Sequence, residues 1–176
     1  MKLSRVANLC LLTTVLLAAV TAAAKDESCD VAGLVGAWTM HVTPQPNPDV
    51  DAVPPPFTAL FVFETGGTFS ETDTGFHPTS AVVIFPEFGA LSGSDGLGAW
   101  KADGGNHYHG KFIKHLFDAS GAHVGFIITR ISITLHGRER LEASSDSAFV
   151  PGEDMNAEPF FTGGLTLATG TRLRAD

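Results

Sequence analysis

From about residue 36 onward, apolar and polar residues alternate in short runs, and glycine-containing turns separate the runs. A period of two is typical of β-strands that bury one face, and glycine accepts the positive φ that tight hairpin turns need. Helical periodicity is nearly absent. The runs predicted as strands are 37–43, 57–64, 68–73, 81–85, 98–103, 107–117, 123–135, 140–150 and 165–173.

Short turns between these runs predict an antiparallel up-and-down meander of eight or nine strands. A sheet of this size can close into a β-barrel, which removes its exposed edges. We therefore expect an all-β, antiparallel up-and-down barrel over residues 37–173, with a two-sheet sandwich as the alternative. Two loops interrupt the pattern. The loop 44–56 holds six of the ten prolines, and 86–96 is rich in glycine; each is a flap over a barrel mouth or a solvated connector.

The N-terminus has the pattern of a signal peptide over residues 1–24. A basic start with Lys2 and Arg5 precedes an apolar run over 6–20, and 22–24 fits a cleavage site. We expect secretion or export to a periplasm, a short segment over 25–36, and Cys29 as the remaining cysteine, either free or paired between chains. A net charge of −8 argues against nucleic acid and anionic membrane surfaces as partners.

Aromatic residues are the most prominent candidate site, with 13 Phe, 2 Trp and 1 Tyr in the chain. Strand parity directs several of these side chains, and one methionine, into a common lumen. An aromatic lumen suits a small hydrophobic ligand, and the alternative is ordinary core packing. The predicted ligand-binding residues are Trp38, Met40, Phe61, Phe63, Trp100, Tyr108 and Phe112.

The Gly-x-Trp motif that ends at Trp38 and the arginine of the last strand, Arg172, resemble the calycin superfamily, which includes the lipocalins. The Gly-Gly-Thr-Phe turn over 66–69, a second Gly-x-Trp ending at Trp100 and the Phe-Asp-x-x-Gly turn over 117–121 are similar to small lipocalin-like proteins. The resemblance implies that Trp38 packs at the closed end of the barrel with Arg172 across it, a favourable cation–π contact. Some barrels of this kind bind hydrophobic compounds, and others cyclise or isomerise polyketide-like or oxylipin substrates.

Histidines on one strand raise a metal hypothesis. His107 and His109 share a face of the run 107–117, and His115 has the same parity. The opposite face carries Tyr108 and the apolar residues Phe112 and Leu116, which suit the interior better. We therefore interpret the histidines as solvated and expect no metal or cofactor.

Candidate catalytic residues are few. Tyr108 or Arg130 could polarise a carbonyl group if its side chain points inward. An outward Arg130 is favoured, because Ile127, Ile131, Ile133 and Leu135 then fill the core. Glu64 and Glu71 flank the first hairpin and are interpreted as surface residues. The sequence shows no nucleophile motif and no phosphate loop.

These features favour an exported lipocalin-like barrel that binds a small hydrophobic molecule in its lumen. One alternative is a barrel enzyme, a cyclase or isomerase that acts on an apolar polyketide- or oxylipin-like substrate by confinement. Another is an interaction or structural protein whose barrel is fully packed.

Overall fold

The computed structural model describes residues 33–47, 53–76 and 87–175. The predicted signal peptide (1–24), Cys29, most of the segment 25–36 and the predicted strand 81–85 lie outside the described residues. No helix within the described ranges is long and apolar enough to cross a membrane. The described residues form the strands β1 (Gly36–Pro44), β2 (Phe57–Phe63), β3 (Thr68–Asp73), β4 (Ser92–Gly93), β5 (Gly96–Gly104), β6 (His107–Phe117), β7 (His123–His136), β8 (Arg140–Pro151) and β9 (Thr166–Arg172).

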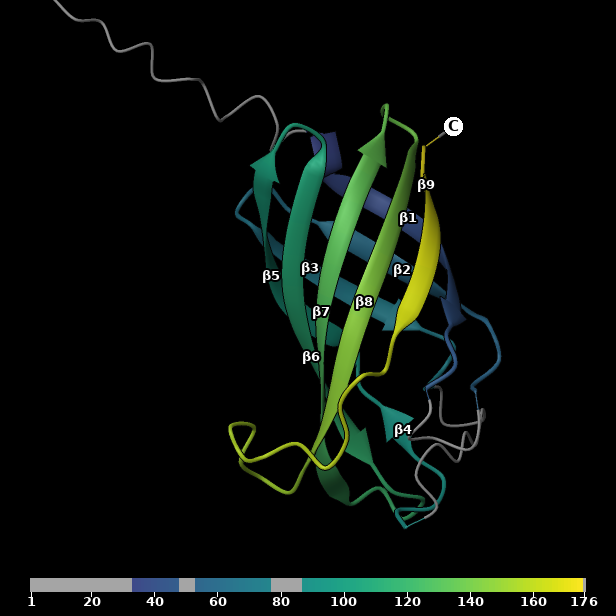
Figure 1. The fold of residues 1–176 in the computed structure, drawn as a ribbon, viewed down its shortest axis with the longest axis vertical. Helices are drawn as coiled ribbons and strands as arrows, with labels where there is room; N and C mark the ends of the chain where they lie inside the picture. The colour runs from purple at the N-terminus through teal and green to yellow at the C-terminus, as the bar shows by residue number, and fades with distance from the viewer. Residues whose placement is uncertain (1–32, 48–52, 77–86, 176) are drawn as a thin grey trace, which may run out of the picture.

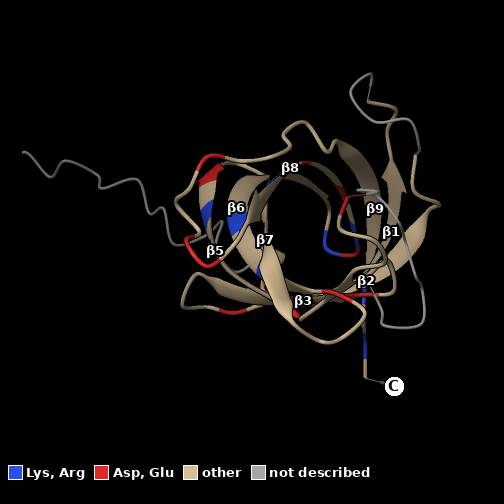
Figure 2. Ribbon diagram, turned by 90° about the horizontal axis from the view of Figure 1, so that it is seen from below, with Lys and Arg blue, Asp and Glu red and all other residues tan. Residues whose placement is uncertain are grey.

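Eight of these strands close into one antiparallel barrel, which confirms the predicted fold class. Each strand pairs with its neighbours in the order β6-β5-β3-β2-β1-β9-β8-β7, and β7 pairs back with β6. Figure 1 shows the strands from the side, and Figure 2, which looks along the barrel from below, shows them as a ring. The sandwich alternative is wrong, because one sheet meets itself.

Alternation along each strand decides which side chains face the interior. On β1, Trp38, Met40 and Val42 are buried, while His41 and Thr43 between them are exposed. This is the pleat expected of a strand with one face on the core. On β7 the isoleucines at 127, 131 and 133 and Leu135 are buried, and Arg130 is exposed. The outward orientation favoured for Arg130 is therefore confirmed.

The predicted contact between Trp38 and Arg172 closes one end of the barrel. The two residues are partners in the β1–β9 ladder, and Arg172 Cζ lies 4.3 Å from the centre of the Trp38 ring. Arg172 Nη1 donates a hydrogen bond to the carbonyl of Val35 and Nε donates one to the carbonyl of Arg138, each over 2.6 Å. The indole Nε1 of Trp38 donates to the carbonyl of Leu34 over 2.9 Å. These contacts tie the first and last strands together at the upper end of the barrel in Figure 1.

Replacing Arg172 with methionine should lower the free energy of unfolding by about 2–3 kcal/mol. The variant loses the cation–π contact and the charged hydrogen bonds to backbone carbonyls, each of which contributes about 1 kcal/mol or more. Urea denaturation measures the change. Arg174→Met is the matched control, because Arg174 lies two residues away in an exposed ion pair with Glu139, and exposed pairs contribute little. Equal losses in the two variants would contradict the role of Arg172.

The described part of the glycine-rich loop, residues 87–95, contains a short strand. Its residues Ser92 and Gly93 form β4, which pairs with Phe117 and Leu116 at the end of β6. The β6 strand extends past the first residue of β5 that pairs with it, Leu97, so its last backbone groups need another partner. Strand β4 supplies it, so this part of the loop forms an extra strand at the edge of the barrel.

Candidate functional site

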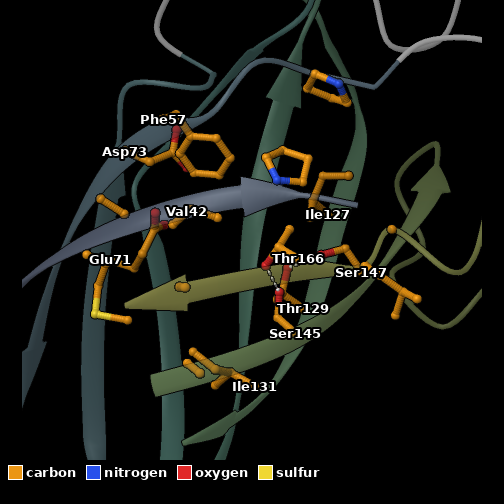
Figure 3. Close-up of a pocket in the computed structure, with 18 of the residues that line it drawn as sticks. Val42, Phe57, Glu71, Asp73, Ile127, Thr129, Ile131, Ser145, Ser147 and Thr166 are labelled. Atoms are coloured by element: carbon orange, nitrogen blue, oxygen red, sulfur yellow. Dashed lines mark hydrogen bonds between the residues drawn. The ribbon is translucent and has the colours of Figure 1, made fainter. Parts of the chain in front are cut away.

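A cavity of about 160 Å³ occupies the half of the barrel opposite Trp38. Inward side chains from every barrel strand except β5 line it, and the loops that follow β1 and precede β2 and β9 complete its outer end. Figure 3 shows part of this lining, including Val42, Phe57 and Ile131. The apolar part of the lining consists of Met40, Val42, Pro44, Pro54, Phe57, Ala59, Phe61, Phe76, Phe112, Ile127, Ile131, Ala143, Phe161, Leu165 and Ala168. Such a wall favours apolar ligand groups.

The predicted ligand-binding residues divide between this cavity and the closed end. Met40, Phe61 and Phe112 line the cavity, whereas the side chains in the other group do not: Trp38, Phe63, Trp100 and Tyr108. All seven side chains are buried in one core cluster inside the barrel, as strand parity predicted, but only three of them line the cavity. At the closed end aromatic rings contact one another directly: Phe63 lies 5.9 Å from Trp100, and Trp100 lies 5.8 Å from Tyr108, measured between ring centres. This half of the lumen is filled by its own side chains.

Three charged side chains meet at one wall of the cavity. Lys114 on β6 contacts two carboxylates on β3, with its Nζ 2.7 Å from Glu71 Oε2 and in direct contact with Asp73 Oδ2. The side chains of Lys114 and Glu71 are each only 3% exposed. Burial of charge is costly unless opposite charges and hydrogen bonds compensate it, so this charged cluster of Glu71, Asp73 and Lys114 needs all its contacts.

Asp73 is the fixed anion of the charged cluster. Its Oδ1 accepts hydrogen bonds from the backbone N–H groups of Gly75 at 2.7 Å and Phe76 at 2.9 Å, and its Oδ2 accepts one from Lys114. Burial opposes ionisation, but the charge of Lys114 and these hydrogen bonds outweigh it and hold the pKa of Asp73 below its ordinary value. Burial also tends to neutralise Lys114, yet the two carboxylates raise its pKa above the usual value. Asp73 and Lys114 therefore form an ion pair at neutral pH.

Glu71 behaves differently from Asp73. Burial is the main cause that raises the pKa of Glu71 from 4.5 to about 8; the Lys114 charge opposes the rise and the Asp73 charge adds to it. Near pH 7 this carboxyl is therefore mostly protonated. Its buried Oε2, although close to Lys114 Nζ, has no partner in hydrogen-bond geometry among the described residues. A titrating group with an unsatisfied oxygen thus lines the cavity.

Gly96, at the start of β5, makes room for the charged cluster. It pairs with Glu71 across the β3–β5 ladder, and a Cβ built on it would lie 2.9 Å from Glu71 Oε2 and 2.8 Å from the Phe112 ring. A larger residue would push against both side chains. The missing side chain at position 96 therefore lets the Glu71 carboxyl group reach Lys114.

Hydroxyl groups from β7, β8 and β9 line the cavity at some distance along the wall from the charged cluster (Figure 3). Thr129 Oγ1 and Ser147 Oγ share a hydrogen bond of 2.9 Å, and Ser145 Oγ and Thr166 Oγ1 share one of 2.7 Å. Because these hydroxyl groups are hydrogen-bonded to each other in pairs, this wall of the cavity is polar but uncharged. Among the described residues that line the cavity, the charged cluster supplies all the ionisable groups.

The two candidate catalytic residues do not meet. Tyr108 is buried at the closed end against Trp100, and Arg130 is exposed on the outside of the barrel, in a shallow surface depression beside Lys101 and Lys111. Arg130 therefore does not point into the lumen, and Tyr108, although buried, does not line the cavity.

The histidines of β6 lie on the outer face, as parity predicted. His107 contacts Thr134, His109 pairs with Asp103 at 2.5 Å, and the Nδ1 of His115 lies 3.2 Å from the Nε2 of His123. Within the described ranges, no group of three histidine, cysteine or acidic side chains is placed to hold a metal ion.

The surface interpretation of Glu71 was wrong, and the charged cluster was missed altogether. A signal for it exists in the sequence. Phe69 is buried, and Glu71 and Asp73 have the same parity on β3. Lys114 likewise has the parity of Tyr108 and Phe112 on β6. The alternation of inward and outward residues along β3 and β6 points the side chains of Glu71, Asp73 and Lys114 into the barrel, although all three are charged.

Comparisons with known proteins add little to this description. The chain matches no protein-family model, and no curated protein matches its sequence. Among solved structures, it is similar to the one described as the crystal structure of Rv2717c from M. tuberculosis. The TM-score is 0.41 and the identity 10%, over 85% of this chain and 98% of that one. That overlap is loose, and the closed barrel described above follows from the strand pairings of this chain.

Proposed function

We propose that the protein binds a small, neutral and largely apolar molecule in the cavity, with a polar group of that molecule directed at Glu71. The observation that carries this proposal is an apolar cavity with one concentrated polar spot, the charged cluster. Most small-molecule sites share this design, in which apolar walls supply affinity and a few polar groups fix orientation.

The size of the cavity limits the part of the ligand that is buried. An apolar cavity of about 150 Å³ holds a single benzene ring, and this one measures about 160 Å³. One six-membered ring or a short branched chain therefore fits. A longer molecule would extend past Gln45 and Leu165 at the outer end of the lining.

The charge of the site favours a neutral ligand. With Glu71 protonated, the positive charge of Lys114 and the negative charge of Asp73 balance. A carboxylate ligand would meet Asp73 without a second cation to balance it, and an ammonium ligand would need Glu71 to ionise. A ketone or alcohol can instead accept a hydrogen bond from the protonated Glu71.

Ala168→Phe tests this proposal by filling the cavity. Ala168 points inward from β9 and lines the cavity, so a phenyl ring there should occupy the space of the ligand. We expect cyclohexanone to bind the native protein saturably in ligand-observed NMR, and the variant to bind at least 10-fold more weakly. Toluene and cyclohexanecarboxylate, measured alongside, test the preference for a neutral polar group.

Thr169→Phe is the matched control, because Thr169 is exposed on the opposite face of the same strand. It should bind cyclohexanone as the native protein does. Equal binding by both variants, or no saturable binding of any probe to the native protein, would refute the proposal.

A lipocalin-like assignment and export from the cytoplasm belong to the same proposal. The closed barrel and the packing of Arg172 over Trp38 support the first. The N-terminal pattern over residues 1–24 supports the second. Mass spectrometry of the protein recovered from its native source would test export, since the mature chain should begin near Lys25.

A further inference from the structure

Glu71 combines properties that a ligand-contacting proton carrier needs. It lines the cavity, its side chain is 3% exposed, and its Oε2 has no hydrogen-bond partner among the described residues. A buried oxygen of this kind in a cavity can accept a hydrogen bond from water or from a polar group of a ligand. Lys114 holds a positive charge 2.7 Å from the same oxygen.

We infer that Glu71 and Lys114 form a proton-transfer centre that isomerises a small β,γ-unsaturated ketone bound in the cavity. This inference rests on the proposed ligand site and adds a reaction to it. It keeps the isomerase alternative raised by the sequence, but assigns the chemistry to the charged cluster instead of Tyr108 and Arg130.

The proposed reaction needs no co-reactant. The Glu71 carboxylate takes a proton from the carbon between the carbonyl and the double bond, and the electron pair of that C–H bond forms a new C=C bond as the carbonyl oxygen becomes an enolate. When Glu71 is ionised it no longer donates to the ketone, so the carbonyl oxygen lies against the Lys114 ammonium, which stabilises the enolate oxygen as it forms. The electrons then return through the double bonds, the γ-carbon takes the proton back from Glu71, and the product is the conjugated ketone.

Asp73 cannot replace Glu71 as the base. Its Oδ1 already accepts two backbone N–H groups and its Oδ2 accepts Lys114, so three of its four lone pairs are engaged. Its lowered pKa also makes it a weak base. Asp73 is a positioning residue that holds Lys114 beside Glu71. An ammonium group has three N–H donors, and the two carboxylates face at most two of them.

The proton affinity of Glu71 suits this role. Proton transfer is most efficient when the pKa of the catalytic group lies near the working pH, and burial brings the Glu71 pKa to about 8. Asp73 and Lys114 are the charged groups that face Glu71 among the described residues of the cavity lining. Both keep their charges near this pH, so the Glu71 titration governs activity.

The test uses cyclohex-3-enone, a one-ring ketone of the size that the cavity accepts. Proton NMR follows its conversion to cyclohex-2-enone in the presence of the full-length protein, and saturation-transfer NMR measures binding in the same samples. We expect conversion above the buffer rate, rising with pH through a midpoint near 8 as Glu71 loses its proton. Glu71→Gln should bind the ketone but convert it at least 100-fold more slowly.

Two further variants separate catalysis from general damage. Glu64→Gln changes the exposed glutamate at the other end of the first hairpin, and should leave both binding and rate unchanged. Asp73→Asn removes the charge that helps to raise the Glu71 pKa, so the midpoint of its pH profile should move to lower pH. A merely structural role for Asp73 would not move the midpoint.

The outcomes are distinguishable. Saturable binding with no conversion above buffer, or full conversion by Glu71→Gln, would overturn the inference while leaving the binding site intact. No saturable binding of any ketone would overturn the proposed function and the inference together. If Glu71→Gln does not fold, the conversion rate of the native protein is measured against pH instead. A rate that does not change between pH 6 and 9.5 would exclude Glu71 as the base.

Discussion

Replacing Lys114 with methionine should destabilise the protein by about 3–5 kcal/mol. The substitution keeps the volume of the side chain but leaves the buried Asp73 carboxylate without its counter-charge. Removing one partner of a buried ion pair typically has a cost of this size, because the remaining charge is neither solvated nor paired. Urea denaturation at pH 7 measures the change.

Two comparisons make this expectation specific. Lys111→Met alters an exposed lysine on the same strand, and should change stability by less than about 0.5 kcal/mol. Adding Glu71→Gln and Asp73→Asn to Lys114→Met removes every charge of the cluster, and should restore most of the lost stability. A loss below about 1 kcal/mol in the single variant would show that the ion pair is dispensable.

Glu71 should make the fold less stable as the pH rises. Its pKa is about 8 in the folded protein against 4.5 when unperturbed, so between these values the folded state holds a proton that the unfolded chain releases. Stability therefore falls with pH across this window and levels off above about 8. At about 1.4 kcal/mol per pH unit, the total is about 4–5 kcal/mol.

The measurement compares the native protein with Glu71→Gln at pH 5, 7 and 9. The variant lacks the titration, so its stability relative to the native protein should rise steadily across the series. Subtracting the two curves cancels the histidines and other groups that both proteins share. Glu64→Gln, at an exposed glutamate, should track the native protein throughout. A constant difference between native and Glu71→Gln would show that Glu71 titrates normally when folded.

Strand parity and turn glycines were enough to predict the barrel. They placed Trp38, Met40 and Val42 on the inner face of β1, and the resemblance at Trp38 and Arg172 identified the contact that joins the ends. Strand parity and turn glycines did not predict that side chains fill one half of the lumen and leave a cavity in the other half. That depends on how rings such as Phe63 and Trp100 pack across the barrel, which involves strands that are distant in the sequence.

The charged cluster was missed for a different reason. Glutamate, aspartate and lysine are rarely buried. For this reason Glu71 was interpreted as a surface residue despite its inward position on the strand, and no prediction was made for Asp73 or Lys114. Each charge alone would be unstable inside. Together they are tolerated because β3 and β6 bring opposite charges into contact. Asp73 and Lys114, which make this contact, are 41 residues apart in the sequence. The alternation of residues along one strand does not show which residue of a distant strand will face it.

The absence of a side chain at Gly96 has an evolutionary consequence. Because a Cβ there would press on Glu71 Oε2, an alanine at this position would displace the carboxyl group relative to Lys114. The acidity of the lumen could thus be retuned by a mutation that alters no ionisable residue. Natural variation at position 96 would then adjust the chemistry of the pocket while every ionisable residue is retained.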